Sequence, residues 1–239
     1  MMVSHRSLLP TIVTATIAAT AAVTTTAMVA LPARADAEDT VLKSTNRFEE
    51  MIAEERTRIP AELLNRSAGI AIIPDVTQGG FILGARHGRG VLAVRNPDGT
   101  WSNPVFLTIS GGSIGLQAGG QSSDVVMVFP DRRMVDRVLD SEVEFGGNVS
   151  GVAGPVGAQP VDPIGDSFSG NTVYTYSRRE GLFGGVALEG GELHIDDSRI
   201  EDYYGLELTP NQVFNPAQPA PPSSLDLKEA LWRASQQYQ

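Results

Sequence analysis

The chain contains no cysteine among its 239 residues. This absence excludes disulfide bonds, a lipid-modified N-terminal cysteine and cysteine ligands for zinc. Histidine is also scarce, with three residues, and no H-E-x-x-H motif is present. We therefore expect neither a metal nor another cofactor, and a fold held together by its apolar core alone.

The first 35 residues have the pattern of a secretory signal peptide. His5 and Arg6 precede a long run rich in Ala, Thr and Val, and Ala33-Arg34-Ala35 ends it with the small residues of an A-x-A cleavage site. We expect cleavage after Ala35 and export to the periplasm or the exterior of the cell, with association to a membrane as one outcome. The alternative is a retained membrane anchor.

Lysine is rare, since 16 of the 18 basic residues are arginine. Removal of residues 1–35 would leave 16 basic against 28 acidic residues, a formal net charge of −12. A field of that sign disfavours nucleic acid as a partner, so an anionic partner must be met by a local basic patch. Arginine suits such a patch because its planar fork binds phosphate in a bidentate manner.

Residues 36–58 predict an amphipathic helix. Apolar residues recur near the 3.6-residue period on one side, and glutamates fill the other. Two roles fit this pattern, a helix packed on the domain and a helix that inserts into a membrane. The glutamates favour packing, because interfacial helices are usually rich in lysine and arginine. The candidate insertion surface consists of Leu42, Phe48, Met51 and Ile52.

Glycine gathers in the middle of the chain, where 24 of the 25 glycines lie between Gly69 and Gly191. Short apolar runs alternate with turn residues over 69–195, which is typical of strands. Such a density of glycine suits strongly curved antiparallel strands. We therefore expect an α+β fold with a curved, largely antiparallel or barrel-like sheet and short flanking helices.

Helices are expected before, within and after this sheet. Pro60 fits the start of a short helix at Ala61–Arg66, which completes the N-terminal helices over 38–66. Residues 131–140 change to helical spacing within the sheet region. The domain is expected to span 36–208. A Pro-rich linker follows at 209–224 and a C-terminal helix and tail at 225–239.

The basic cluster Arg86-His87-Gly88-Arg89-Gly90 lies between two apolar runs, where the sequence predicts a hairpin tip. Two guanidinium groups, an imidazole and open backbone amides could bind a phosphate or a lipid headgroup. A turn that only exposes polar residues explains the cluster equally well. Arg178 and Arg179 add to the cluster only if the fold brings them near it.

No catalytic motif is convincing. The G-x-S-x-G elbow of α/β-hydrolases is missing. Residues 165–169 superficially resemble the serine block of a class of lipases, but Gly191 stands three residues before His194, where an Asp is expected. A serine-type hydrolase that uses Ser167 or His194 is therefore the least favoured hypothesis, and we expect no catalytic residues.

An ordered set of motifs runs from about Leu63 to Tyr204. It comprises Ser67-Ala68-Gly69-Ile70-Ala71-Ile72, Gly79-Gly80-Phe81, Gly88-Arg89-Gly90-Val91-Leu92, Asp98-Gly99-Thr100-Trp101-Ser102, Asp124-Val125-Val126 and Gly181-Leu182-Phe183-Gly184-Gly185-Val186-Ala187-Leu188-Glu189-Gly190. Together these segments closely resemble the SYLF domain, also described as the actin-binding domain of a yeast actin-patch protein.

The resemblance implies a non-enzymatic module that binds lipids, with phosphoinositides as ligands in eukaryotic members and actin as a further partner in fungal members. It associates lipid binding with basic residues and with an amphipathic N-terminal helix. The counterpart of that helix here, 36–58, departs from the pattern by its glutamates. An exported protein would not meet actin, so actin is not an expected partner.

The sequence thus favours an exported, non-catalytic domain that binds a lipid or membrane surface. The candidate headgroup contacts are Arg86, His87, Arg89, Arg178 and Arg179. The alternative is a structural or protein-interaction component of the cell envelope, in which 225–239 engages a protein partner.

Overall fold

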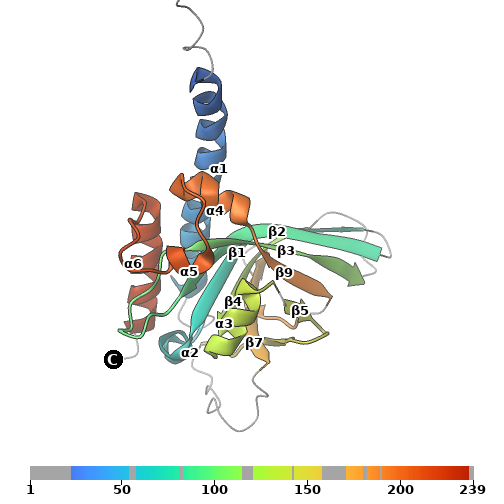
Figure 1. Ribbon diagram of the computed structural model, residues 1–239. Coiled ribbons are helices and arrows are strands. Elements are labelled where there is room, and N and C mark those ends of the chain that lie inside the picture. Colours follow the sequence, from blue (N-terminus) through green and yellow to red (C-terminus); the bar gives the residue numbers. More distant parts are fainter. Residues whose placement is uncertain are drawn as a thin grey trace, which may run out of the picture.

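The computed structural model describes residues 23–53, 58–80, 83–114, 121–141, 143–157, 171–179, 182–188 and 190–236 (Figure 1). The helices are α1 (Val23–Ala53), α2 (Ala61–Arg66), α3 (Arg132–Leu139), α4 (Asp197–Tyr204), α5 (Pro210–Val213) and α6 (Pro222–Gln236). The strands are β1 (Gly69–Gly80), β2 (Leu83–Val94), β3 (Val105–Ile114), β4 (Gln121–Phe129), β5 (Val143–Phe145), β6 (Ser150–Ala153), β7 (Thr172–Arg179), β8 (Leu182–Gly185) and β9 (Gly191–Ile195).

The strands form a single curved, nearly closed sheet. Its order is β5-β9-β3-β2-β1-β4-β7-β6, and β8 pairs with β7. The β6–β7 pair is parallel, and the other strand pairs in the described part of the chain are antiparallel. Helices flank this sheet, so the predicted α+β fold with a curved, barrel-like sheet is confirmed.

The sheet has two differently covered faces. On one face, which we call the α1 face, the Ser44 hydroxyl of α1 donates a hydrogen bond to the Ile72 carbonyl at 3.4 Å. α4 covers the same face, where Tyr203 meets Phe106 edge to face at 5.2 Å between ring centroids. On the opposite face, the α3 face, Val135 of α3 occupies the space beside Gly69. The buried core lies on both sides of the central strands.

The sheet bends sharply in the middle of β1. The register of β1 shifts between Ile72 and Thr77 against β2, and Asp75 within this bulge has a positive φ of 51°. At the bend, a side chain at Gly90 would collide with the Ile72 carbonyl group. Glycine is therefore required there by a close approach of two backbones, as the predicted strand curvature implies.

The structure corrects the position of the first hairpin. Gly80 pairs with Gly84, so the chain reverses between these two residues and the segment from Arg86 to Arg89 lies within β2. The predicted tip is therefore wrong, because Gly88 and Gly90 accommodate neighbouring parts of β1 instead of forming a turn. Residues 81–82 of the predicted apolar run lie outside the described residues.

The C-terminal segment also differs from the prediction of an extended linker and a separate tail. Thr209 and Gln212 form a capping box that starts α5, and Val213 is buried. α6 begins at Pro222 and packs its buried residues, among them Leu231, against α1 and α2. Proline at the start of a helix is compatible with helical geometry, so the Pro-rich composition did not prevent a packed structure.

The first helix is longer than predicted towards the N-terminus. α1 is continuous from Val23 to Ala53, and its side chains become buried from Ala37 onward. α2 coincides with the predicted second helix, and α3 lies within the predicted range 131–140.

The apolar stripe of α1 packs on the domain and does not form an exposed insertion surface. Phe48 and Met51 are 0% and 2% exposed, and Ile52 packs against the same core. Leu42 is 41% exposed. The structure therefore corrects the insertion hypothesis for Phe48 and Met51, because their burial in the core removes them from any contact with a membrane in this conformation.

We predict that Phe48→Ala lowers the free energy of unfolding by about 3–5 kcal/mol, since it opens a cavity in the core. Leu42→Ala on the same helix serves as the control and should change it by less than about 1 kcal/mol. Urea denaturation followed by circular dichroism measures both. Equal effects of the two substitutions would contradict the packing of α1 described above.

Candidate functional site

Alternation along the strands separates the predicted basic residues onto two faces. Gly88 lies on the α3 face, against Val76, so Arg86 two residues earlier projects to that face. His87 and Arg89 project to the α1 face, where they line a groove beside α1. Register places Arg178 opposite Asp124, which contacts α1. Arg179 consequently projects to the α3 face.

Arg178 is part of an ion-pair network beneath α1. Its guanidinium is paired with Glu50, whose carboxylate also accepts a hydrogen bond from Arg47 Nη1 at 3.1 Å. Arg47 Nε lies 3.4 Å from Asp124 Oδ2, and the backbone N–H of Asp75 donates to Asp124 Oδ1 at 3.1 Å. Arg178 therefore has a role in fixing α1 to the sheet.

The pKa values of the two central carboxyl groups of this network, Glu50 and Asp124, shift in opposite directions. The hydrogen bond from Arg178, with that from Arg47, lowers the pKa of Glu50 despite its partial burial. Burial raises the pKa of Asp124, against the opposing effects of the Asp75 N–H and Arg47. The difference follows from exposure, because the side chain of Asp124 is 13% exposed and that of Glu50 is 43% exposed.

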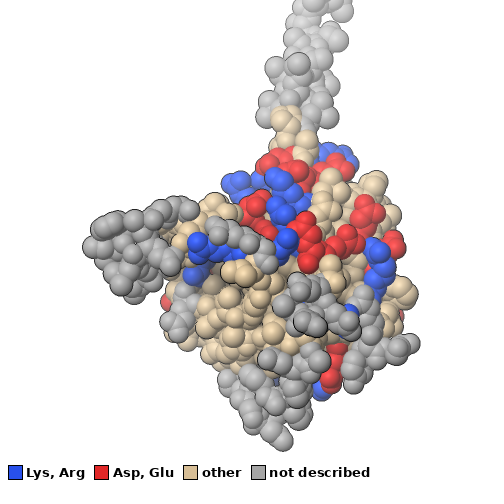
Figure 2. All heavy atoms as spheres, turned by 180° about the vertical axis from the view of Figure 1, so that it is seen from behind, with Lys and Arg blue, Asp and Glu red and all other residues tan. Residues whose placement is uncertain are grey.

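His87 and Arg89 line a groove of mixed charge. The groove has a volume of about 240 Å³ and lies between α1, the β1–β2 pair and Arg199 of α4. Lys43 in its wall is paired with Asp39 at 2.8 Å, and Arg199 is paired with Asp36. Figure 2 shows blue and red side chains intermixed below the projecting part of α1. The groove is therefore not a uniformly basic surface.

The α3 face carries a different arrangement at one end of the sheet, which we call the cationic row. Gln78 of β1 lies opposite Arg86 of β2 on one side and opposite Gln121 of β4 on the other. The side-chain oxygen of Gln121 accepts a hydrogen bond from Arg179 of β7. The cationic row consists of Arg86, Gln78, Gln121 and Arg179.

The row brings two arginines, Arg86 and Arg179, to one face of the sheet. Next to it on the same face, the strands carry Val76, Ser123 and Ser177. Arg86 is half-buried, and burial lowers its pKa. The Nη1 atom of Arg86 lies 3.7 Å from the position that a Cβ atom on Gly191 would take, so Arg86 reaches towards β9. An anionic surface at this end of the sheet would face two guanidinium groups and two amide side chains.

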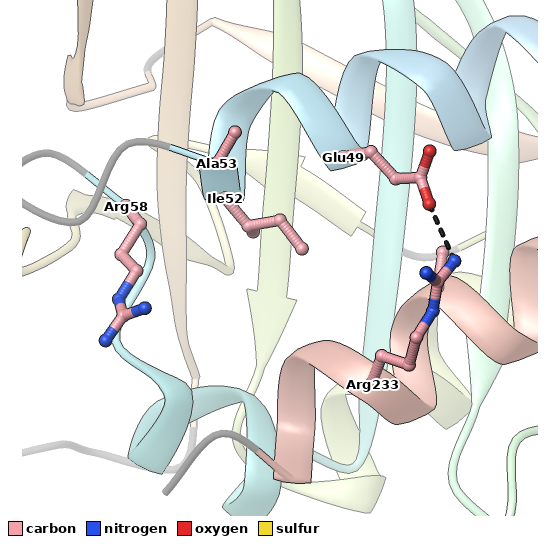
Figure 3. A pocket seen from close by; sticks show the side chains of 6 residues that line it. Glu49, Ile52, Ala53, Arg58 and Arg233 are labelled. Atoms are coloured by element: carbon pink, nitrogen blue, oxygen red, sulfur yellow. Dashed lines mark hydrogen bonds and ion pairs between the residues drawn. The ribbon is translucent and has the colours of Figure 1, made fainter.

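A second cavity lies between the end of α1 and α6 (Figure 3). Its volume is about 260 Å³. In its wall, Arg233 Nη2 of α6 forms an ion pair with Glu49 Oε1 of α1 at 2.9 Å. Ile52 and Ala230 supply an apolar part of the wall. Because the cavity forms where two helices join and its charges pair across it, we assign it to the packing of α6.

The residues considered for hydrolysis do not form a catalytic arrangement in the described part of the chain. Ser167 lies outside the described residues. The Nε2 atom of His194 lies 3.0 Å from a carboxylate oxygen of Glu192. Among the described residues there is no group of three or more His, Asp or Glu side chains able to hold a metal ion.

The described helices differ in the apolar surface that they expose. Among those that the structure describes, none is long and apolar enough to cross a membrane. On α6, the predicted partner-binding helix, Leu225 and Trp232 are 53% and 51% exposed, while Leu227 and Leu231 are buried. Residues 225–236 therefore contribute to the core and also present an apolar surface, and a protein partner for them stays a prediction.

Sequence reasoning missed the two glutamines of the cationic row. Gln78 and Gln121 lie in segments without a recognisable motif and come together only through the pairing of β1 with β4. A register derived from the burial pattern of β4 could have placed Gln121, but not its partner across the sheet.

We predict that Glu50→Gln lowers stability at pH 7 by less than about 1 kcal/mol, because the pair is partly exposed and screened by solvent. The pKa of Glu50 is lower in the folded state than its ordinary value of 4.5, so the contribution of the ion pair is present above about pH 4.5 and is lost as pH falls through the folded pKa. Denaturant unfolding of both proteins between pH 3 and pH 7 measures this. A stability difference that stays constant over this range would contradict it.

Comparison with known proteins places the chain in a family. The family model Ysc84, described as Las17-binding protein actin regulator, matches residues 110–234. Protein YSC84 of Saccharomyces cerevisiae is 32% identical over 175 residues, which are 72% of this chain and 37% of that protein. Human SH3 domain-containing YSC84-like protein 1 is 31% identical over 182 residues, which are 76% of this chain and 53% of that protein.

The chain therefore spans between about a third and a half of the length of these relatives. No solved structure matches it. The family match extends through α5 and most of α6, in agreement with their packing on the domain. On these grounds the chain belongs to the Ysc84 family and contains a SYLF domain.

Proposed function

We propose that this SYLF domain is a non-catalytic module that binds anionic membrane surfaces through the cationic row. The observation that carries the proposal is that strand register gathers two arginines and two amide side chains at one end of the α3 face. On the α1 face, Arg47 and Arg178 are paired with carboxylates. On the α3 face, Arg86 and Arg179 stand in a row whose other members are amides. Guanidinium groups and amides together suit the phosphate oxygens of a lipid headgroup.

This proposal narrows the set of headgroup contacts. His87 and Arg89 lie on the opposite face, beside carboxylates of α1, and cannot contact the same headgroup as Arg86. The chain has a net charge of −10, so attraction by its overall field does not explain binding to an anionic surface. Binding must therefore depend on the cationic row.

The names of the relatives refer to binding of Las17, to actin regulation and to SH3 domains. These properties belong to longer proteins, of which this chain matches a part. We transfer to this chain only the domain itself and propose a surface-binding role for it, without actin as a partner.

We test the cationic row with the full-length chain and two vesicle types, phosphatidylglycerol and phosphatidylcholine. Wild type should bind the anionic vesicles more tightly, and the preference should fall as salt rises. Arg86→Gln/Arg179→Gln should reduce the preference about tenfold or more, since each arginine near an anionic surface contributes about 1 kcal/mol. Vesicle flotation measures the binding. Comparing the two vesicle types cancels any contribution of the apolar N-terminal run.

The matched control is Arg132→Gln/Arg133→Gln, which removes the same charge from exposed positions of α3. It should keep the preference within about twofold. Arg86→Lys/Arg179→Lys should keep part of the preference, because the positive charge remains while the planar fork of arginine is lost. Circular dichroism spectra that match wild type show that the glutamine variant is folded. Equal losses in the row variant and the α3 control would refute a specific role of the row.

We also propose that the chain is exported and cleaved after Ala35. The packing of α1 supports this proposal, because Ala37 is its first buried residue in the described side chains. Cleavage there would also retain Asp36 and its ion pair with Arg199.

When the chain is expressed in a bacterial host, we predict that the exported protein has the mass of a chain whose first residue is Asp36. Ala33→Arg/Ala35→Arg should block processing, since the cleavage site requires small residues. Mass spectrometry of the cell fractions measures both. If all of the recovered wild-type protein is unprocessed, cleavage after Ala35 is ruled out.

A further inference from the structure

The most exposed large apolar side chain of the described residues is Leu182, at the start of β8. It is 80% exposed, compared with 57% for Leu206 and 53% for Leu225. A single exposed leucine needs no explanation in general. The position of Leu182 relative to the cationic row gives it significance.

Leu182 lies beside the cationic row. In the β7–β8 pair it is directly opposite Arg179, so the two side chains project to the same face of the sheet. β7 ends at Arg179 and β8 begins at Leu182, at the end of the sheet where β4 begins with Gln121. An exposed apolar group therefore stands next to the arginine and amide groups of the row.

The exposure of Leu182 is imposed by a well-anchored hairpin. Phe183, the next residue, stacks on Tyr176 with 5.8 Å between ring centroids and an angle of 3° between planes. Tyr176 is buried, and its hydroxyl donates to the Pro155 carbonyl at 3.0 Å. Because Phe183 is held on one face, alternation directs Leu182 to the other, where it remains in solvent.

We propose that the β7–β8 hairpin is the apolar membrane contact of this domain. Leu182 enters the boundary between headgroups and acyl chains, while Arg179 and Arg86 meet headgroup phosphates. A lipid surface fits this combination because it offers anionic groups and apolar depth within a few ångströms of each other. The inference rests on the proposed function and adds to it the part of the domain that penetrates the surface.

The absence of cysteine permits a direct test. In the full-length chain, Leu182→Cys is labelled with the environment-sensitive fluorophore nitrobenzoxadiazole. Leu206→Cys, labelled in the same way at an exposed leucine after α4, is the control. On addition of phosphatidylglycerol vesicles, the emission at position 182 should rise at least about twofold and shift to shorter wavelength, because the probe leaves water. The emission at position 206 should not change.

A second arm measures affinity. Leu182→Asn should weaken binding to phosphatidylglycerol vesicles about tenfold, as expected for loss of a substantial part of the burial of one leucine, whereas Leu206→Asn should have no effect. Neither substitution changes the charge. Circular dichroism spectra that match wild type confirm that both variants are folded.

The outcomes separate the inference from the proposed function. If the cationic row confers anionic preference but the probe at position 182 stays unchanged on bound vesicles, the hairpin inference is overturned and the proposed function stands. If wild type shows no anionic preference, both are overturned. A change at position 182 that depends on protein concentration without vesicles would indicate contact with a second copy of the chain and would also overturn the inference.

Discussion

The register of β1 is the constraint on which the rest of the structure depends. β1 is hydrogen-bonded to β2 on one side and to β4 on the other, so it sets the direction of side chains in three strands. The bulge around Asp75 bends this strand and shifts its register, and Gly90 lets the two backbones approach at the bend. Alternation along β2 sends the neighbours Arg86 and His87 to opposite faces of the sheet, and this register places Arg86 opposite Gln78 and His87 opposite Thr77.

The division of charge between the faces follows from where α1 lies. α1 brings Arg47 and Glu50 onto the sheet, and the charges of β4 and β7 on that face pair with them. Such partly exposed pairs add little free energy each, whereas burial of apolar side chains such as Phe48 and Met51 contributes more to the attachment of α1. Apolar packing therefore holds α1 on the sheet, and the ion pairs orient it there.

The cationic row and the β7–β8 hairpin together place the proposed membrane contact at the end of the sheet where β7 meets β8. The amphipathic helix that the sequence suggested as the membrane contact has no part in it. In this arrangement α1 is a structural element, and its buried stripe is part of the core. An acidic protein can bind an anionic surface in this way, because the local arrangement of Arg86 and Arg179 matters more at contact distance than a net charge screened by salt.

The sequence by itself determined the fold class, the α2 and α3 helices and the family, because local periodicity and ordered motifs are properties of adjacent residues. It did not determine that Arg86 lies inside a strand, since glycines in a turn and glycines at a close backbone approach look alike. Composition also misled at 209–224, where capping by Thr209 and burial of Val213 produced packed structure. Only the tertiary structure decided which basic residues stand together and that Leu182 stands beside them. Strand register joins residues far apart in the chain, and no local pattern encodes it.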